Sequence, residues 1–165
     1  MHDSLNVLFL CTHNSARSIL AEVLLNHLGQ GRFKAYSAGS SPRDGGSPNA
    51  IGLQVLRDHG FDTTGLRSKN WDEFAGPDAP QMDLIITVCD NAAGETCPYW
   101  PGNPASAHWG YPDPSAGDGT TEEKHEAFRQ TLHGMRRRLQ ALVNLPHEKL
   151  AKLSLQQSAK ELAHS

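Results

Sequence analysis

Short apolar runs alternate with helical patterns along most of the chain, and this alternation limits the possible folds more than any other feature. The runs at residues 5–10, 33–37 and 83–88 have the length and apolar character of buried strands, and residues 105–109 form a weaker fourth run. Apolar residues repeat at helical spacing over 15–28 and 122–145, and start and stop signals predict a further helix over 48–59. Alternating strands and helices favour a parallel sheet with helices on both of its faces.

Residue types at the segment ends refine this prediction. Ser47 followed by Pro48 predicts a helix N-cap, and Gly60 predicts the end of that helix. In the last long segment the apolar residues recur every three or four positions, which predicts one buried stripe. The triplet Arg136–Arg138 is expected on the exposed face of that helix. A length of 165 residues suits one domain over 1–145, followed by a C-terminal helical extension over 146–165 that carries no recognisable motif.

Charge and composition exclude several classes of protein. The formal net charge of -3 gives no sign of a nucleic-acid partner. No apolar run approaches the roughly 18 residues that a membrane span requires, and the first residues lack the basic segment of a signal peptide. We therefore expect a cytoplasmic protein. The three cysteines are then more typical of structural, metal-binding or catalytic thiols than of a disulfide framework.

The first chemical motif lies where the first strand passes into the first helix. We call this segment, residues 11–18, the anion loop. Backbone N–H groups at a helix N-terminus bind tetrahedral oxyanions, and an arginine side chain can clamp two anion oxygens. Cys11 would be held as a thiolate, below the free thiol pKa of roughly 8.5. Asn14 tolerates the left-handed backbone of a tight loop, and Ser18 could donate to the Cys11 sulfur. The expected oxyanion-binding residues are Thr12, His13, Asn14, Ser15, Ala16, Arg17 and Ser18.

The anion loop follows an apolar strand and consists of a cysteine, five further residues, an arginine and a serine. This pattern resembles the loop of low-molecular-weight tyrosine phosphatases and of the arsenate reductases that share their fold. The resemblance extends from Val7 to about Leu142. It implies a three-layer α/β fold, with a four-stranded parallel sheet flanked by helices. It also implies that the general acid is an Asp followed by Pro in a late loop, which Asp113 matches.

Two further cysteines distinguish the possible activities. Cys89 directly follows the third expected strand, so it should share the carboxyl edge of the sheet with Cys11. Ester hydrolysis has no use for additional thiols there, whereas arsenate can accept two electrons from a pair of thiolates. The resemblance implies a relay in which Cys11, Cys89 and Cys97 act in turn, as in the thioredoxin-linked arsenate reductases. Those relatives carry one residue fewer between the last two cysteines.

Other interpretations of the cysteines stay open at this point. Cys89, Cys97 and His108 could bind a metal, although their spacing is not typical of zinc sites. The later cysteines could also be unrelated buried residues. The chain would then be a phosphatase of the same fold, or a module that binds an anion or arsenite without turnover.

Some relatives bind potassium behind the loop, at positions that match Asn14, Glu22 and Ser37. Their acidic fourth ligand aligns with Lys69, so we expect Lys69 to pair with Glu22 and no metal to bind. We expect no bound cofactor. The expected substrate is arsenate, with phosphate and sulfate as competing anions. The expected partner is an external thiol reductant, either thioredoxin or glutathione with glutaredoxin.

Overall fold

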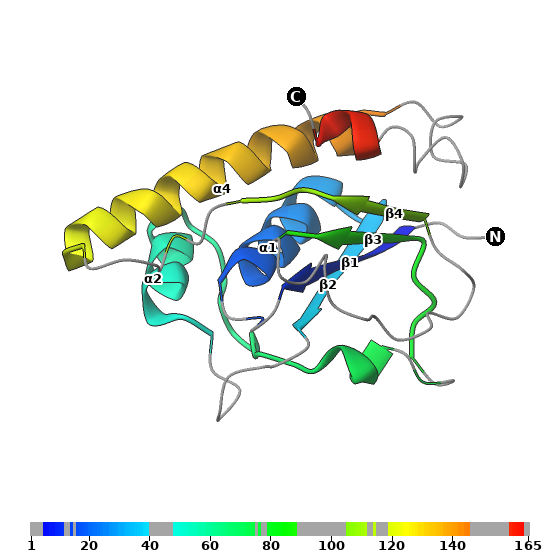
Figure 1. Cartoon of the computed structure of the whole chain (residues 1–165), viewed down its shortest axis with the longest axis horizontal. Helices are drawn as coiled ribbons and strands as arrows, with labels where there is room; N and C mark the ends of the chain where they lie inside the picture. The colour runs from blue at the N-terminus through cyan, green and yellow to red at the C-terminus, as the bar shows by residue number, and fades with distance from the viewer. Residues whose placement is uncertain are drawn as a thin grey trace.

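The computed structural model describes residues 5–11, 14, 16–39, 48–74, 76, 79–88, 105–111, 114, 119–145 and 159–163. The named elements within these ranges are four strands, three α-helices and one 3-10 helix, and residues 159–162 add a short helical turn (Figure 1). In chain order these are β1 (Leu5–Cys11), α1 (Arg17–Gly29), β2 (Phe33–Gly39), α2 (Ala50–Asp58), the 3-10 helix η2 (Trp71–Phe74), β3 (Leu84–Thr87), β4 (Ala105–His108) and α4 (Thr121–Val143).

All four strands are parallel, and their order in the sheet is β2-β1-β3-β4. The first crossover places β2 on one side of β1, and the chain then returns to place β3 on the other side. The strand order therefore reverses between β1 and β3. Ligands of open α/β sheets bind outside the carboxyl ends of the strands at such a reversal. Cys11 is the last residue of β1 and lies at this point.

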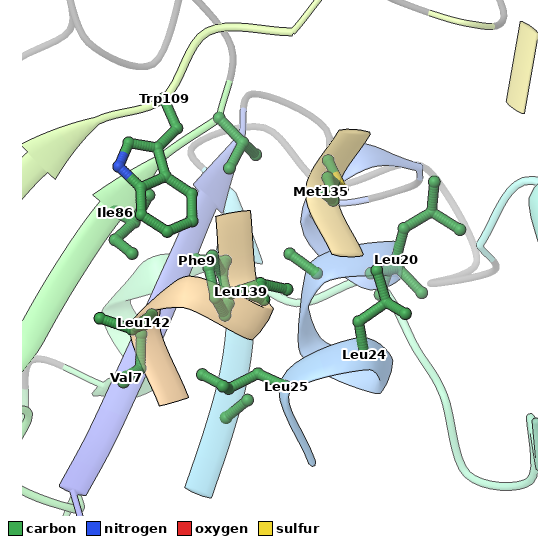
Figure 2. Close-up of a cluster of buried hydrophobic side chains, with 14 of the residues drawn as sticks. Val7, Phe9, Leu20, Leu24, Leu25, Ile86, Trp109, Met135, Leu139 and Leu142 are labelled. Carbon is green, nitrogen blue, oxygen red and sulfur yellow. The ribbon is translucent and has the colours of Figure 1, made fainter. Parts of the chain in front are cut away.

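One face of the sheet packs against α1 and α4, and the two helices also contact each other. Figure 2 shows side chains from β1, α1 and α4 meeting in this core. The apolar stripe predicted for α4 is confirmed, since Phe128, Leu132, Met135, Leu139 and Leu142 are all buried. In the described part of the chain, the opposite face is covered by a smaller cluster around η2. The four-stranded parallel sheet predicted from the sequence is thus confirmed, with its main helical layer on one side.

The start of α2 differs from the sequence prediction. Asn49 is the N-cap rather than Ser47, because the Asn49 side chain accepts hydrogen bonds from the backbone N–H groups of Ile51 and Gly52. The helix consequently begins at Ala50. Asparagine and serine are equally good caps, so residue preference alone could not separate the two positions.

Asn26 of α1 occupies the outer edge of β2. Its Oδ1 accepts from the Ala35 backbone N–H at 2.8 Å, and its Nδ2 donates to the Ala35 carbonyl at 3.2 Å. Further along the same edge, the Gly39 N–H donates to the Lys69 carbonyl at 2.8 Å. Two outward-facing positions of the strand are therefore already hydrogen-bonded.

The predicted domain boundary after residue 145 lies just beyond the end of α4 at Val143. Residues 146–158 lie outside the described ranges, and residues 159–162 form one helical turn beside α4 (Figure 1). Residues 159–163 are called the C-terminal turn below. No helix in the described ranges combines the length and the apolar character that a membrane span requires.

Candidate functional site: an oxyanion loop at the carboxyl edge of the sheet

The anion loop joins the end of β1 to the start of α1. Cys11 ends the strand and is buried, and Arg17 is the first residue of the helix. N-cap Ala16 has no polar side chain, so it cannot cap the backbone N–H groups of the first helical turn. That turn contains no acidic residue, and Arg17 adds a positive charge to the positive end of the helix dipole. Thr12, His13 and Ser15 lie outside the described residues.

Asn14 organises the described part of this loop. Its φ angle of 48° confirms the left-handed backbone expected from its residue type. The side chain is fully buried; its Nδ2 donates to Ser18 Oγ at 2.7 Å, and its Oδ1 accepts from the Lys69 backbone N–H at 2.8 Å. The Asn14 carbonyl accepts from Ser68 Oγ at 2.7 Å. Ser18 uses its oxygen as the acceptor from Asn14, so its hydroxyl hydrogen takes no part in that bond.

Behind the loop, Lys69, Glu22 and Ser37 form a small polar cluster. The Lys69 ammonium lies 3.8 Å from Glu22 Oε1 and 3.5 Å from Ser37 Oγ, and the Ser37 hydroxyl donates to the same carboxylate. The two charged side chains are only 11% and 17% exposed, so this is a sheltered ion pair rather than a surface contact. Burial lowers the pKa of Lys69 and the Glu22 carboxylate partly opposes that effect. The ammonium thus lies close to two groups of the expected potassium set, Glu22 and Ser37, whereas the third, Asn14, bonds the Lys69 backbone.

The carboxyl ends of β1 and β3 are directly hydrogen-bonded. The Val88 N–H donates to the Leu10 carbonyl at 2.9 Å, and the Tyr111 N–H donates to the Val88 carbonyl at 3.2 Å. The Arg17 guanidinium completes this arrangement, because its Nη1 donates to the Tyr111 carbonyl at 2.8 Å. Leu10 immediately precedes Cys11, and Val88 immediately precedes Cys89.

Three of the predicted catalytic residues, Cys89, Cys97 and Asp113, lie outside the described residues. Tyr111, two positions before Asp113, is described, and it contacts the arginine of the anion loop. The described chain segments that lead to Cys89 and Asp113 therefore meet at the end of β1.

His108, considered above as a metal ligand, ends β4 and contacts a hydroxyl group. Its Nδ1 lies 2.7 Å from Thr87 Oγ1 on the neighbouring strand. Within the described ranges no cluster of three or more His, Cys, Asp or Glu side chains is arranged to bind a metal ion.

Three features of this region were missed by sequence reasoning. The Tyr111 carbonyl accepts from Arg17, and Trp109 Nε1 donates to the Ala159 carbonyl at 2.8 Å. Arg138 was expected on an exposed helix face, but that prediction is wrong. Its guanidinium lies 5.0 Å from the centroid of the Tyr111 ring, and its Nη2 donates to the Ala163 carbonyl at 3.2 Å. The positional pattern of α4 does not distinguish Arg138 from exposed Arg136, because each of the two arginines adjoins a buried position.

Comparison with known proteins agrees with this geometry. The family model of low molecular weight phosphotyrosine protein phosphatases matches residues 6–157. An arsenate reductase from Halalkalibacterium halodurans is 35% identical over 134 residues, which cover 81% of this chain and 91% of that protein.

Solved structures show the same likeness. The arsenate reductase of Archaeoglobus fulgidus superposes with a TM-score of 0.65 at 28% identity, over 84% of this chain and 99% of that one. A thioredoxin-dependent arsenate reductase of Corynebacterium glutamicum shares the fold, with a TM-score of 0.55 at 24% identity over 84% of this chain and 63% of that one. The chain thus belongs to the low molecular weight phosphotyrosine protein phosphatase family, within which the relatives described here are arsenate reductases.

Proposed function

We propose that the protein reduces arsenate to arsenite, using Cys11, Cys89 and Cys97 as a thiol relay and an external thiol as the reductant. The observation that carries this proposal is the hydrogen-bonded junction of Leu10, Val88 and Tyr111 beside Arg17. It brings together the segments that lead into two of the thiols and into the expected acid. The arsenate reductases among the relatives support the choice of substrate.

The first step uses the positive environment of the anion loop. Arsenate binds to the N–H groups at the start of α1 and to Arg17, which face a developing negative charge. The Cys11 thiolate attacks arsenic and forms a sulfur–arsenic bond. One arsenate oxygen departs, and Asp113 supplies the proton that lets it leave as water.

The next steps move two electrons onto arsenic. The Cys89 thiolate attacks the Cys11 sulfur, the sulfur–arsenic bond breaks, and its electron pair stays on arsenic. Arsenic(V) thereby becomes arsenic(III), arsenite is released, and a Cys11–Cys89 disulfide forms. The Cys97 thiolate then attacks the Cys89 sulfur, which releases Cys11 and leaves a Cys89–Cys97 disulfide.

The last disulfide must be reduced from outside the protein. Thioredoxin is our first candidate, because three cysteines in one chain suit a dithiol reductant; glutathione with glutaredoxin is the alternative. The chemistry needs thiols that are kept reduced between turnovers, which fits a cytoplasmic location.

The decisive experiment compares two reactions in matched variants. The native protein should oxidise reduced thioredoxin, or glutathione with glutaredoxin, only when arsenate is present, and Cys89→Ser should abolish this reaction. Cys11→Ser should abolish both arsenate reduction and any hydrolysis of para-nitrophenyl phosphate. Mass spectrometry after a single turnover should find the Cys89–Cys97 disulfide.

A different outcome would favour a phosphatase. Efficient hydrolysis of para-nitrophenyl phosphate that is unaffected by Cys89→Ser, without arsenate-dependent thiol oxidation, would contradict the proposal. Binding of arsenate or arsenite without either activity would also contradict it.

A further inference from the structure

Arg138 differs from the two arginines that precede it on α4. Arg136 and Arg137 are exposed, whereas Arg138 is partly buried between the Tyr111 ring and the C-terminal turn. Its Nη1 makes no hydrogen bond with the described residues. The contact with the ring and the bond to Ala163 are thus the two described interactions that define its position.

Tyr111 lies between Arg138 and the anion loop. Its ring lies beneath the Arg138 guanidinium and also approaches α4 closely, since a Cβ atom at Gly134 would lie 3.8 Å from Tyr111 Cε1. On its backbone side, the Tyr111 carbonyl accepts from Arg17 and its N–H donates to Val88. A shift of Tyr111 would therefore move the hydrogen-bond acceptor that orients Arg17.

The C-terminal turn holds the same segment at a second point. Trp109 is 1% exposed, and its indole N–H donates to the carbonyl of Ala159, which is itself fully buried. The Trp109 backbone N–H donates to the Thr87 carbonyl at the end of β3. Figure 2 labels Trp109 and Ile86 among the buried side chains of the main core. Residues 109 and 111 are thus each connected to the C-terminal turn, one directly and one through Arg138.

We propose that Arg138 and the C-terminal turn position the oxyanion site: they fix Tyr111, and the Tyr111 carbonyl fixes the Arg17 guanidinium. The inference rests on the proposed function, because it takes Arg17 as an anion ligand. One Arg17 nitrogen bonds Tyr111, and an arginine has further N–H groups with which to bind the anion. Binding is tighter when such a fork is already oriented before the anion arrives. Arg138 is a positioning residue, and it touches no substrate in this scheme.

The test is phosphate binding to the full-length reduced protein, measured by isothermal titration calorimetry. Arg138→Met removes the charge and the hydrogen-bond donors while it keeps an unbranched side chain. We expect its dissociation constant for inorganic phosphate to rise roughly three- to tenfold, within the range of coupling seen for residues that act through a neighbour. Arg138→Lys keeps a cation over the ring and should restore part of the affinity. Arg136→Met, on the same helix but exposed, is the matched control and should bind phosphate like the native protein.

A second variant guards against a general loss of folding. Trp109→Phe removes the indole donor to Ala159 and keeps most of the buried ring, and it should also weaken phosphate binding. In assays with arsenate, both variants should raise KM more than they lower kcat, whereas a smaller folded fraction would lower kcat alone. Native affinity for phosphate in folded Arg138→Met and Trp109→Phe would overturn the inference.

This test is separate from that of the proposed function. Phosphate binding requires neither Cys89 nor Cys97 and involves no turnover. If the native protein binds phosphate but does not reduce arsenate, the reductase proposal fails and the positioning of Arg17 can still be measured. If the native protein reduces arsenate, but Arg138→Met and Trp109→Phe bind phosphate as tightly as the native protein does, only the positioning role fails.

Discussion

Replacing Asn14 by alanine removes a fully buried side chain of the anion loop that makes two hydrogen bonds. Two short side-chain hydrogen bonds disappear, so the partly buried Lys69 N–H loses its acceptor and the buried Ser18 Oγ loses a donor. Each buried polar group left unsatisfied costs about 1–3 kcal/mol. Alanine must also adopt the left-handed backbone of this position, at a cost of roughly 1–2 kcal/mol. The low end of the first range applies to the partly buried Lys69 N–H and the full range to buried Ser18, so we expect the free energy of unfolding to fall by about 3–6 kcal/mol in total.

The assay is equilibrium unfolding in urea, followed by phosphate titration of the folded variant. With a denaturant slope of about 1–3 kcal/mol per molar urea, the midpoint should fall by roughly 2 M. Asn14→Gly separates the two contributions, because glycine adopts the backbone angle of 48° without strain but cannot make the hydrogen bonds. The glycine variant should therefore be more stable than the alanine variant, yet less stable than the native protein.

Asn26→Ala is the matched control for this series. It also removes two hydrogen bonds of an asparagine side chain, here both with the Ala35 backbone, but at an exposed position on the outer edge of β2. We expect a smaller loss of stability and unchanged phosphate affinity. The reasoning would be refuted if Asn14→Ala were no less stable than Asn26→Ala, or if it bound phosphate as tightly as the native protein.

Three further predictions follow from the charged groups and helix caps. The rate of arsenate reduction should be the same in potassium and sodium chloride at equal ionic strength, because the Lys69 ammonium already lies beside Glu22 and Ser37; a rate increase specific to potassium would contradict this. Burial lowers the pKa of Lys69 in the folded protein. At pH values between this lowered pKa and the ordinary lysine pKa of about 10.4, the unfolded chain therefore binds more protons than the folded chain. The unfolding free energy of the native protein minus that of Lys69→Met should thus rise with pH through this range. Urea unfolding at several alkaline pH values measures this difference, and a decrease with rising pH would contradict the prediction. Thr120 forms a capping box with Glu123 at the start of α4, so Thr120→Ala should cost about 1 kcal/mol without changing phosphate affinity, as thermal unfolding and calorimetry would show.

Sequence patterns predicted those parts of the structure that local periodicity controls. The apolar stripe of α4 repeats within each turn, and four consecutive residues of β1, 7–10, are fully buried. Patterns of this kind report burial directly, so the strands and the parallel sheet could be predicted. The left-handed angle of Asn14 was also predictable, because few residue types other than glycine adopt it readily.

The features that sequence reasoning missed depend on contacts between distant residues. Arg138 has exposed arginines beside it, and only its contacts with Tyr111 and Ala163, which lies 25 residues away, set it apart. The link between Asn14 and the Lys69 backbone spans 55 residues. No periodic pattern encodes such pairs, because their geometry arises only after the sheet and helices have assembled. The positions of Cys89, Cys97 and Asp113 stay predictions, since those residues lie outside the described ranges.

The side chain of Asn26 has a consequence for how copies of this protein can meet. Unpaired N–H and C=O groups on a border strand invite another chain to add a strand of its own. The amide of Asn26 imitates such a strand at Ala35, and the backbone of Lys69 does so at Gly39. Strand addition at this border would first have to displace both, so self-association through β2 is disfavoured even in a crowded solution.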